Sequence, residues 1–342
     1  MHAISVDEFR AQLQYLCRHY EFVTLDECLQ ALESGDEDFP DNAALLTFDD
    51  GYLEHFTTVC PLLEERGIQG WFFPTAKAVL HHEVLDVNKI QFILAAVPRL
   101  SDVVDDLYRW LDAYRAVYQL QSTECYVARS RQDVARQRYT SEETTVIKRL
   151  LQRELEEPAR RHVVRDLFKK YVTADEAGFS SEIYMSLEQL QHMARRGMYI
   201  GSHGYDHCWL NVLAPREQRE EIDRSVEFLR EVGAPTDRWV MCYPYGAYND
   251  SLIAILRERG CRMALTSRLG MARLTAENAL TLERLDTNDF PKVAGAPPNA
   301  WTRQLMRIGG ASTLNDSALA GRVATIEDPG DGQGTAEEAD EE

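Results

Sequence analysis

Three short motifs with polar side chains constrain the fold most, because each follows a run of residues that resembles a strand. Residues 47–52 (TFDDGY) follow the apolar run 43–46, and residues 202–207 (SHGYDH) follow the run 198–201. A third motif, residues 243–246 (YPYG), also resembles a loop that follows a strand. Short apolar runs bounded by turn residues predict buried strands. Chemistry-bearing groups at the carboxyl ends of strands are typical of a barrel-like α/β enzyme, which is the fold we expect.

The first two motifs carry side chains that suit a metal ion. Neighbouring strand residues point opposite ways, so Asp49 and Asp50 can serve one site only if the chain turns, as Gly51 allows. His203 and His207 are four residues apart, which predicts that they share one face of a helical turn. Two imidazoles and a carboxylate favour a divalent transition metal, zinc first, although cobalt, nickel and manganese suit the same donors.

Each motif also has an ordinary structural explanation. An Asp-Asp pair is usually a solvated turn, and two histidines at this spacing are more often surface or core residues than ligands. A Tyr-Pro-Tyr-Gly segment alone predicts only a turn. The combination of the motifs, in this order and each near a strand end, is what favours an active site.

At these residues the chain resembles the NodB-type polysaccharide deacetylases of carbohydrate esterase family four. These enzymes have a T-F-D-D-G loop, an H-[ST]-x-x-H-like pair and a Pro-Tyr-Gly-type loop, and they remove acetyl groups from amino sugars. The resemblance implies a distorted (β/α) barrel. It also implies that Asp49 is the catalytic base, that Asp50, His203 and His207 bind the metal, and that the backbone N–H of Tyr245 helps to form the oxyanion hole.

The chemistry of amide hydrolysis is consistent with these roles. A metal ion lowers the pKa of water and polarises the acyl oxygen, while Asp49 accepts a proton as general base. Pro244 has no N–H, so Tyr245 supplies the first backbone donor after it. Gly246 allows the backbone to approach the substrate closely.

Two positions depart from the family pattern. Gly204 stands where the family usually has Ser or Thr, and Cys242 stands where many members have an Arg that orients the catalytic Asp. The Cys242 variant resembles the poly-N-acetylglucosamine deacetylase branch more than the peptidoglycan or chitin branch.

The general acid is a further departure, because the family usually has a late His and no histidine follows His207. The corresponding strand is expected at residues 280–286. We expect Arg284 to replace the orienting Arg, and Asp286 or a water at the metal to act as the acid. A structural salt bridge between Arg284 and Asp286 is the alternative.

The domain organisation follows from an insertion between the motifs. We expect a deacetylase barrel at residues 1–77 and 183–309. A helical insertion is expected at residues 78–182, and an acidic, disordered tail at residues 310–342. Apolar residues recur at helical spacing within 94–120 and 146–171 of the insertion. Its arginines either pair locally with acids or hold an anionic group of the substrate: Arg129, Arg131, Arg136, Arg138, Arg160, Arg161 and Arg165.

Charge and cysteine content limit the partners and the compartment. The net charge of −19 argues against a nucleic acid as a binding partner. Eight acidic residues lie in residues 327–342, so the rest of the chain has a net charge of −11. Seven scattered cysteines without a C-x-x-C pair favour a reducing compartment. Neither a signal segment nor a run of about 18 apolar residues is present, so we expect a cytoplasmic protein.

Only four residues precede Ser5, whereas family members usually carry a further strand there. We expect either a barrel that lacks this strand or a homo-oligomer in which a neighbouring chain completes the open edge.

The expected function is metal-dependent removal of an N-acetyl group from an amino sugar, free, nucleotide-linked or lipid-linked, in glycan biosynthesis. Three alternatives stay open: a small-molecule C–N hydrolase such as a deformylase or amidohydrolase, an inactive carbohydrate-binding homologue, and an O-deacetylase.

Overall fold

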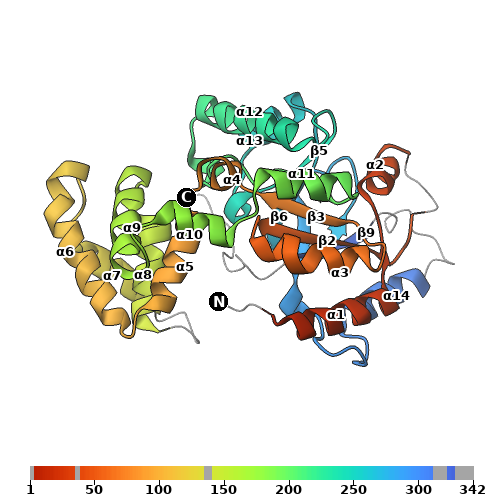
Figure 1. The fold of residues 1–342 in the computed structure, drawn as a ribbon, viewed down its shortest axis with the longest axis horizontal. Coiled ribbons are helices and arrows are strands. Elements are labelled where there is room, and N and C mark those ends of the chain that lie inside the picture. Colours follow the sequence, from red (N-terminus) through yellow and green to blue (C-terminus); the bar gives the residue numbers. More distant parts are fainter. Residues whose placement is uncertain (1–3, 35–38, 135–140, 311–321, 328–342) are drawn as a thin grey trace. The chain divides into compact units, whose positions relative to one another are not determined.

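The computed structural model describes residues 4–34, 39–134, 141–310 and 322–327. The chain forms two compact units, which are described separately. The larger unit comprises Met1–His81 and Glu182–Glu342, and the smaller comprises His82–Ser181 (Figure 1). The limits of the smaller unit fall within four residues of those expected for the helical insertion.

The larger unit alternates helices and strands. Its strands are β1 (Glu21–Phe22), β2 (Ala43–Asp50), β3 (Gly70–Pro74), β4 (Tyr199–Ile200), β5 (Trp239–Cys242), β6 (Cys261–Leu269), β7 (Ala272–Arg273), β8 (Leu282–Asp286) and β9 (Arg322–Glu327). Its α-helices are α1 (Val6–His19), α2 (Leu25–Ser34), α3 (Cys60–Glu64), α4 (Ala76–His81), α11 (Leu187–Arg195), α12 (Pro215–Val232), α13 (Asp250–Glu258) and α14 (Ala300–Gly310). A π-helical turn, His55–Val59, precedes α3.

Seven of the strands form a closed parallel barrel, while β1 pairs with β2 and β7 pairs antiparallel with β9 outside it. The order of the seven is β4-β3-β2-β9-β8-β6-β5. Ser202, just after β4, makes a parallel bridge with Met241 of β5, which joins the two ends of this order. The Ser202 N–H donates to Val240 at 3.0 Å and the Ser202 carbonyl accepts from Cys242 at 2.8 Å. The α/β barrel expected from the sequence is therefore confirmed, distorted by its two-residue strand β4.

Alternating side chains of the strands build two cores, as the two-residue period of a strand requires. One core lies inside the barrel and is closed at one end by Leu25, Cys28 and Leu29 of α2. Its strand residues are Ala43, Leu45, Trp71, Phe73, Tyr199, Val240, Cys242, Met263, Leu265 and Leu282. The other core lies between the strands and the surrounding helices, and it includes Ala44, Leu46, Phe48, Phe72, Ile200, Trp239, Met241 and Ala264.

The strand β9 corrects one expectation. It pairs in parallel with β2, from Ala44↔Ala324 to Thr47↔Glu327, and with β8 at Leu285↔Ile326. The predicted tail from residue 310 is therefore wrong for residues 322–327, which lie inside the sheet. The position between β2 and β8 is thus filled by a strand of the same chain, and the homo-oligomer stays a prediction. The rest of the expected acidic tail, residues 328–342, lies outside the described residues.

The smaller unit is helical. Its helices are α5 (Asp86–Ala96), α6 (Leu100–Tyr118), α7 (Thr123–Val134), α8 (Glu142–Arg149) and α9 (Glu157–Tyr171); α10 (Glu176–Ile183) runs across the boundary. A π-helical turn, Leu150–Glu154, separates α8 from α9. Buried residues such as Leu107, Leu111 and Val163 pack the helices together.

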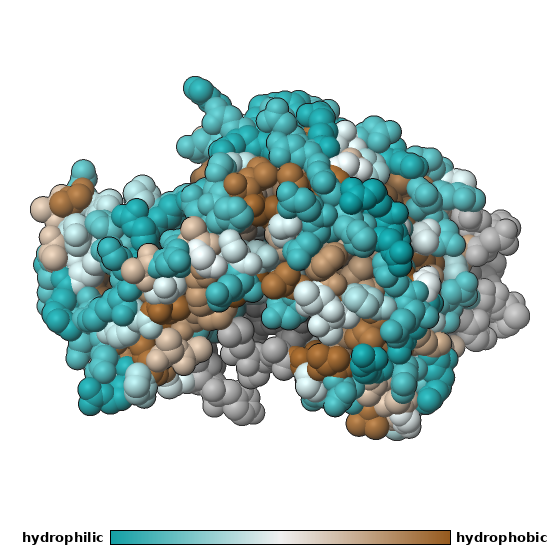
Figure 2. Space-filling model, viewed as in Figure 1, coloured by the Kyte–Doolittle hydropathy of each residue, from teal (hydrophilic) through white to brown (hydrophobic). Residues whose placement is uncertain are grey.

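Within the described residues, none of the helices is both long and apolar enough to cross a membrane. The face of the molecule in Figure 2 is largely hydrophilic, with scattered hydrophobic residues.

Candidate active site

The strand β2 brings two carboxylates to the carboxyl end of the barrel. The sequence suggested that the strand stops before them, but β2 runs through Asp49 to Asp50. Asp50 then adopts a left-handed conformation with φ of 67°, followed by Gly51 at 82°. This turn breaks the alternation of side chains, so both carboxylates serve one site.

Asp50, His203 and His207 form a compact buried triad. The Oδ1 atom of Asp50 lies 3.6 Å from Nε2 of His203 and 3.5 Å from Nε2 of His207. The two Nε2 atoms are 3.2 Å apart. Ligands bound tetrahedrally to zinc at about 2.0–2.1 Å would be separated by about 3.4 Å, so these three donors fit such an ion. The exposed fractions of the three residues are 1%, 2% and 5%.

A backbone contact sets the tautomer of His203. Its Nδ1 lies 2.8 Å from the carbonyl oxygen of Cys242, to which an Nδ1–H donates. Nε2 is then the unprotonated nitrogen and faces the triad. Metal-binding histidines usually have their other nitrogen held in this way.

The loop between the histidines is not the helical turn predicted from their spacing. Residues 203–207 contain only coil and bends. Gly204 has φ of 75° and His207 has φ of 48°. Because side chains rarely adopt such φ values, a glycine suits position 204, where the family usually has Ser or Thr.

Glu221 of α12 holds this loop in place. Its Oε2 accepts hydrogen bonds from the backbone N–H of Tyr205 at 2.8 Å and of Asp206 at 3.3 Å. The Cys208 thiol donates to its Oε1 at 3.5 Å. Burial raises the pKa of Glu221, and the two backbone donors partly oppose this effect.

Asp49 is held by one of its two carboxylate oxygens. Its Oδ2 accepts from Arg284 at 2.8 Å and from the thiol of Cys242 at 3.3 Å. Among the described residues, its buried Oδ1 has no hydrogen-bond partner. The guanidinium of Arg284 is itself fixed by a 2.9 Å hydrogen bond to the Thr266 carbonyl. Asp49 therefore offers one positioned oxygen beside the triad.

The environment of Asp49 favours its charged form. Burial alone would raise the pKa of this carboxyl, but the charge of Arg284 and the hydrogen bonds from Arg284 and Cys242 outweigh it. The net effect is a pKa below the ordinary value, so Asp49 is ionised at neutral pH.

The third motif forms a strained loop next to the triad. Tyr245 has φ of 59°, and its ring centroid lies 4.8 Å from that of His207. Gly246, with φ of 67°, passes so close to Ser267 that an added Cβ would lie 2.9 Å from the Ser267 nitrogen. The backbone of this loop is therefore fixed beside the triad.

Asp286 is less well placed than the sequence suggested. It ends β8, and its Oδ1 accepts two 2.7 Å hydrogen bonds from the backbone and side chain of Asn288. Its own N–H donates to Asp289. These contacts stay within one turn, a geometry that favours a capping role; its role as general acid stays a prediction.

The insertion arginines belong to the smaller unit and are described within it. Of the arginines in the insertion, Arg129 pairs with Glu154 at 2.9 Å and Arg161 pairs with Glu157 at 2.5 Å. Arg131, Arg136 and Arg138 have side chains outside the described set.

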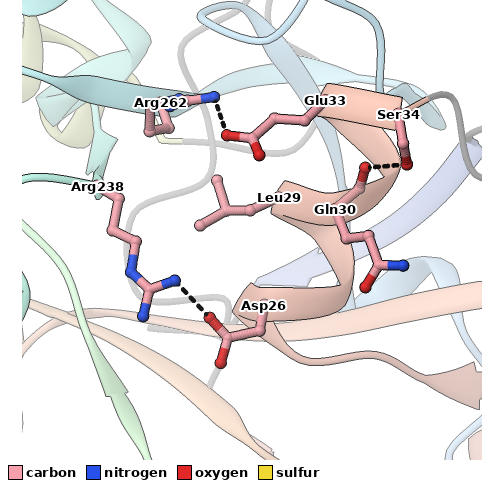
Figure 3. A pocket seen from close by; sticks show the side chains of 7 residues that line it. All are labelled: Asp26, Leu29, Gln30, Glu33, Ser34, Arg238 and Arg262. Carbon is pink, nitrogen blue, oxygen red and sulfur yellow. Dashed lines mark hydrogen bonds and ion pairs between the residues drawn. The ribbon is translucent and has the colours of Figure 1, made fainter.

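A pocket of about 310 Å³ lies at the amino ends of β5 and β6, against α2 (Figure 3). Its arginines are paired, Arg238 with Asp26 at 3.1 Å and Arg262 with Glu33 at 2.6 Å. It is at the opposite end of these strands from the triad. Its charged residues act as ties between α2 and the barrel.

Comparison with known proteins agrees with the geometry. The family model described as polysaccharide deacetylase matches residues 36–109 and 158–264, which is more than half of the chain. The chain belongs to the polysaccharide deacetylase family. The matched ranges of the chain contain Asp49, Asp50, His203, His207 and Tyr245, whereas Arg284 lies beyond them.

Individual relatives are more distant. The putative polysaccharide deacetylase YxkH of Bacillus subtilis (strain 168) is 30% identical over 89 residues. This match covers 26% of the chain and 32% of the relative, so the chain spans about a third of the length of that protein.

Two solved structures are similar over most of the chain. The Streptococcus pyogenes deacetylase PplD in complex with acetate has a TM-score of 0.50 and 16% identity, covering 89% of this chain and 86% of that one. IcaB from Ammonifex degensii has a TM-score of 0.48 and 20% identity, covering 89% and 88%. The likeness to PplD supports the NodB-type fold.

Sequence reasoning missed several residues of the site. Cys242 was noted only as a departure, yet its thiol contacts Asp49 and its carbonyl contacts His203. Glu221 and Trp209 had no motif to mark them. The ring of Trp209 stacks on that of Tyr245, with centroids 4.5 Å apart.

Proposed function

We propose that this protein is a metal-dependent deacetylase that removes an N-acetyl group from an amino sugar. The observation that carries the proposal is the triad of Asp50, His203 and His207 beside a carboxylate with one positioned oxygen. A divalent cation, zinc first, would be held by these three side chains. When bound, it would lower the pKa of a water molecule and polarise the acyl oxygen.

Side chains and backbone groups of the chain would carry out the proton transfer and stabilise the oxyanion. Asp49 accepts a proton from the attacking water at Oδ1, while Arg284 and Cys242 hold Oδ2. The backbone N–H of Tyr245 donates to the developing oxyanion, an interaction typically worth about 3 kcal/mol of barrier.

As the C–N bond breaks, the leaving amine needs a proton. Asp286 is the candidate acid from the sequence, and replacing it with Asn tests this role. Turnover that is unchanged in Asp286→Asn would remove it from the mechanism and leave it a turn cap.

The test of function is acetate release from N-acetylated amino sugars, free and nucleotide-linked. The protein is stripped of metal with a chelator and then resupplied with zinc, cobalt, nickel or manganese. We expect release only with metal, and loss of release in Asp49→Asn. The matched control is Asp26→Asn, which alters an ion-paired aspartate at the other end of the barrel.

A second readout does not depend on turnover. Zinc should raise the melting temperature of the wild type and of Asp49→Asn but not of His207→Ala, because an ion that binds only the folded state stabilises it. Metal-dependent stabilisation without acetate release from any substrate would overturn the deacetylase proposal and favour a small-molecule hydrolase or an inactive binder.

A further inference from the structure

A row of aromatic rings leads away from the triad. The ring centroid of His207 lies 4.8 Å from that of Tyr245, at an interplanar angle of 68°. Tyr245 in turn stacks on Trp209, with centroids 4.5 Å apart and planes only 4° from parallel. Trp209 comes two residues after His207, so the loop that binds the metal also positions the indole.

This row changes from buried to partly exposed. His203 and His207 are buried, whereas Tyr245 and Trp209 are both half-buried. The nearly parallel stack fixes the plane of the indole, since one of its faces lies against the tyrosine ring. A large aromatic side chain that stays partly exposed beside a catalytic centre is a feature of binding sites.

The neighbouring groups are polar. Asp206, in the same loop, pairs with Lys77 at 3.1 Å, and both side chains are about one fifth exposed. A carboxylate and an ammonium can accept from and donate to hydroxyl groups. An indole that shares its loop with such polar groups suits a ligand with an apolar face and a polar rim.

We propose that Trp209 is a specificity-determining residue that stacks against a sugar ring of the substrate. The inference rests on the proposed function and names the part of the site that recognises saccharide. A pyranose ring presents C–H groups on its face and hydroxyl groups on its rim, which matches this surface. With the acetyl group at the triad, the sugar ring extends outward over the aromatic row.

A purely structural role for Trp209 predicts different kinetics. Tyr245 has a strained φ of 59°, and the stack could serve only to hold it there. Loss of the indole would then disturb the backbone N–H of Tyr245 and slow every substrate equally. Loss of a sugar platform would instead weaken only substrates that contain a sugar ring.

Kinetics on two acyl donors separate these roles. The donors are the tetramer of N-acetylglucosamine and glyceryl triacetate, which has no ring. For Trp209→Ala we expect KM for the tetramer to rise about tenfold or more, with kcat/KM for the triacetate within about twofold of the wild type. Trp209→Phe should restore most of the affinity, and Trp301→Ala controls for loss of another half-buried indole. An equal loss on both donors, or no change on the tetramer, would overturn the proposal.

A binding measurement keeps this inference distinct from the proposed reaction. Tetramer binding is measured by calorimetry on zinc-loaded Asp49→Asn with and without Trp209→Ala. Binding that is about tenfold weaker without the indole supports the platform, even if the wild type released no acetate and the hydrolytic function failed. Equal binding by the two variants, or no binding by Asp49→Asn, would overturn it.

Discussion

Arg284 reaches Asp49 across 235 positions of the chain. We propose that it replaces the Arg that many family members carry at the position of Cys242. Both the guanidinium and the carboxylate are largely buried, with side chains 3% and 12% exposed. Removal of one partner from a buried ion pair is costly, typically about 3–5 kcal/mol, because the other charge loses its partner. We propose that the pair both orients Asp49 as the base and keeps it charged.

The first prediction concerns this pair. Arg284→Met should lower kcat by about 100-fold or more, because Asp49 loses its orienting partner. It should also move the acidic limb of the pH profile of kcat/KM to higher pH. The sign follows because Arg284 lowers the pKa of Asp49, so its removal raises that pKa and the base is protonated at higher pH.

Two variants control for this change. Arg284→Lys keeps a positive charge and should keep the acidic limb closer to that of the wild type. Arg262→Met removes an arginine that pairs with Glu33 at the other end of the barrel and should leave the profile unchanged. A profile that does not move in Arg284→Met would show that the contact does not govern the base.

The second prediction concerns Gly246. Gly246→Ala should lower activity strongly, because its Cβ would collide with the backbone of Ser267 and shift the loop that carries Tyr245. Gly233→Ala is the matched control, since Gly233 also has a positive φ, of 83°, but has open space around its missing Cβ. Both variants should lose about 1 kcal/mol of stability from the positive φ, the collision should add to this loss in Gly246→Ala, and only Gly246→Ala should lose turnover. Equal activity of the two variants would contradict this.

At the scale of elements, the helical unit depends on an acidic residue between two helices. Asp106 of α6 accepts hydrogen bonds from Lys170 and, at 2.5 Å, from Tyr171, both at the end of α9. Burial would raise the pKa of Asp106, but these hydrogen bonds and the charges of Lys170 and Arg109 outweigh it, so the pKa is lowered. The charged carboxylate thus joins α6 to α9.

The third prediction is that Asp106→Asn lowers the free energy of unfolding by about 1–2 kcal/mol at neutral pH. Because the folded pKa is below the ordinary value, this stabilisation is present above about pH 4 and is lost as the pH falls through the folded pKa. The difference between wild type and variant should therefore shrink in acid. Urea unfolding at several pH values measures it, and Asp105→Asn, at an exposed position of the same helix, should have little effect. A difference that is independent of pH would contradict the account.

At the scale of the whole molecule, β9 closes the sheet between β2 and β8. Both neighbours are strands on which site residues lie: β2 carries Asp49 and Asp50, and β8 carries Arg284. Without β9, the facing edges of β2 and β8 would leave backbone N–H and C=O groups without hydrogen bonds. The register of these two strands would then be less well fixed. The geometry of the candidate site therefore depends on β9.

The fourth prediction follows from this position. A chain that ends after residue 310 should lose stability, expose strand edges and aggregate, and lose activity together with metal binding. A chain that ends after residue 327 keeps β9 and is the matched control, with stability and activity close to the full chain. Size-exclusion chromatography and thermal unfolding distinguish them. Equal behaviour of the two truncations would show that β9 does not support the barrel.

The sequence determined the kinds of residue at the site and the type of fold. Asp49, Asp50, His203 and His207 could be recognised because each lies in a short motif near a strand, and such local patterns depend only on neighbouring residues. The late strand with Arg284 was also recognised. The helical insertion could be predicted from apolar spacing, and the structure divides the chain within a few residues of its expected limits.

The tertiary structure decided which distant segments meet. The contact of Arg284 with Asp49 depends on closure of the barrel, and the strand β9 depends on a free position between β2 and β8. Gly204 and His207 have positive φ values, so the loop that contains them is not a helical turn. The end of the barrel and the hydrogen bonds to Glu221 fix the path of this loop. No local pattern predicts these contacts, since their free energy comes from packing between segments far apart in the chain.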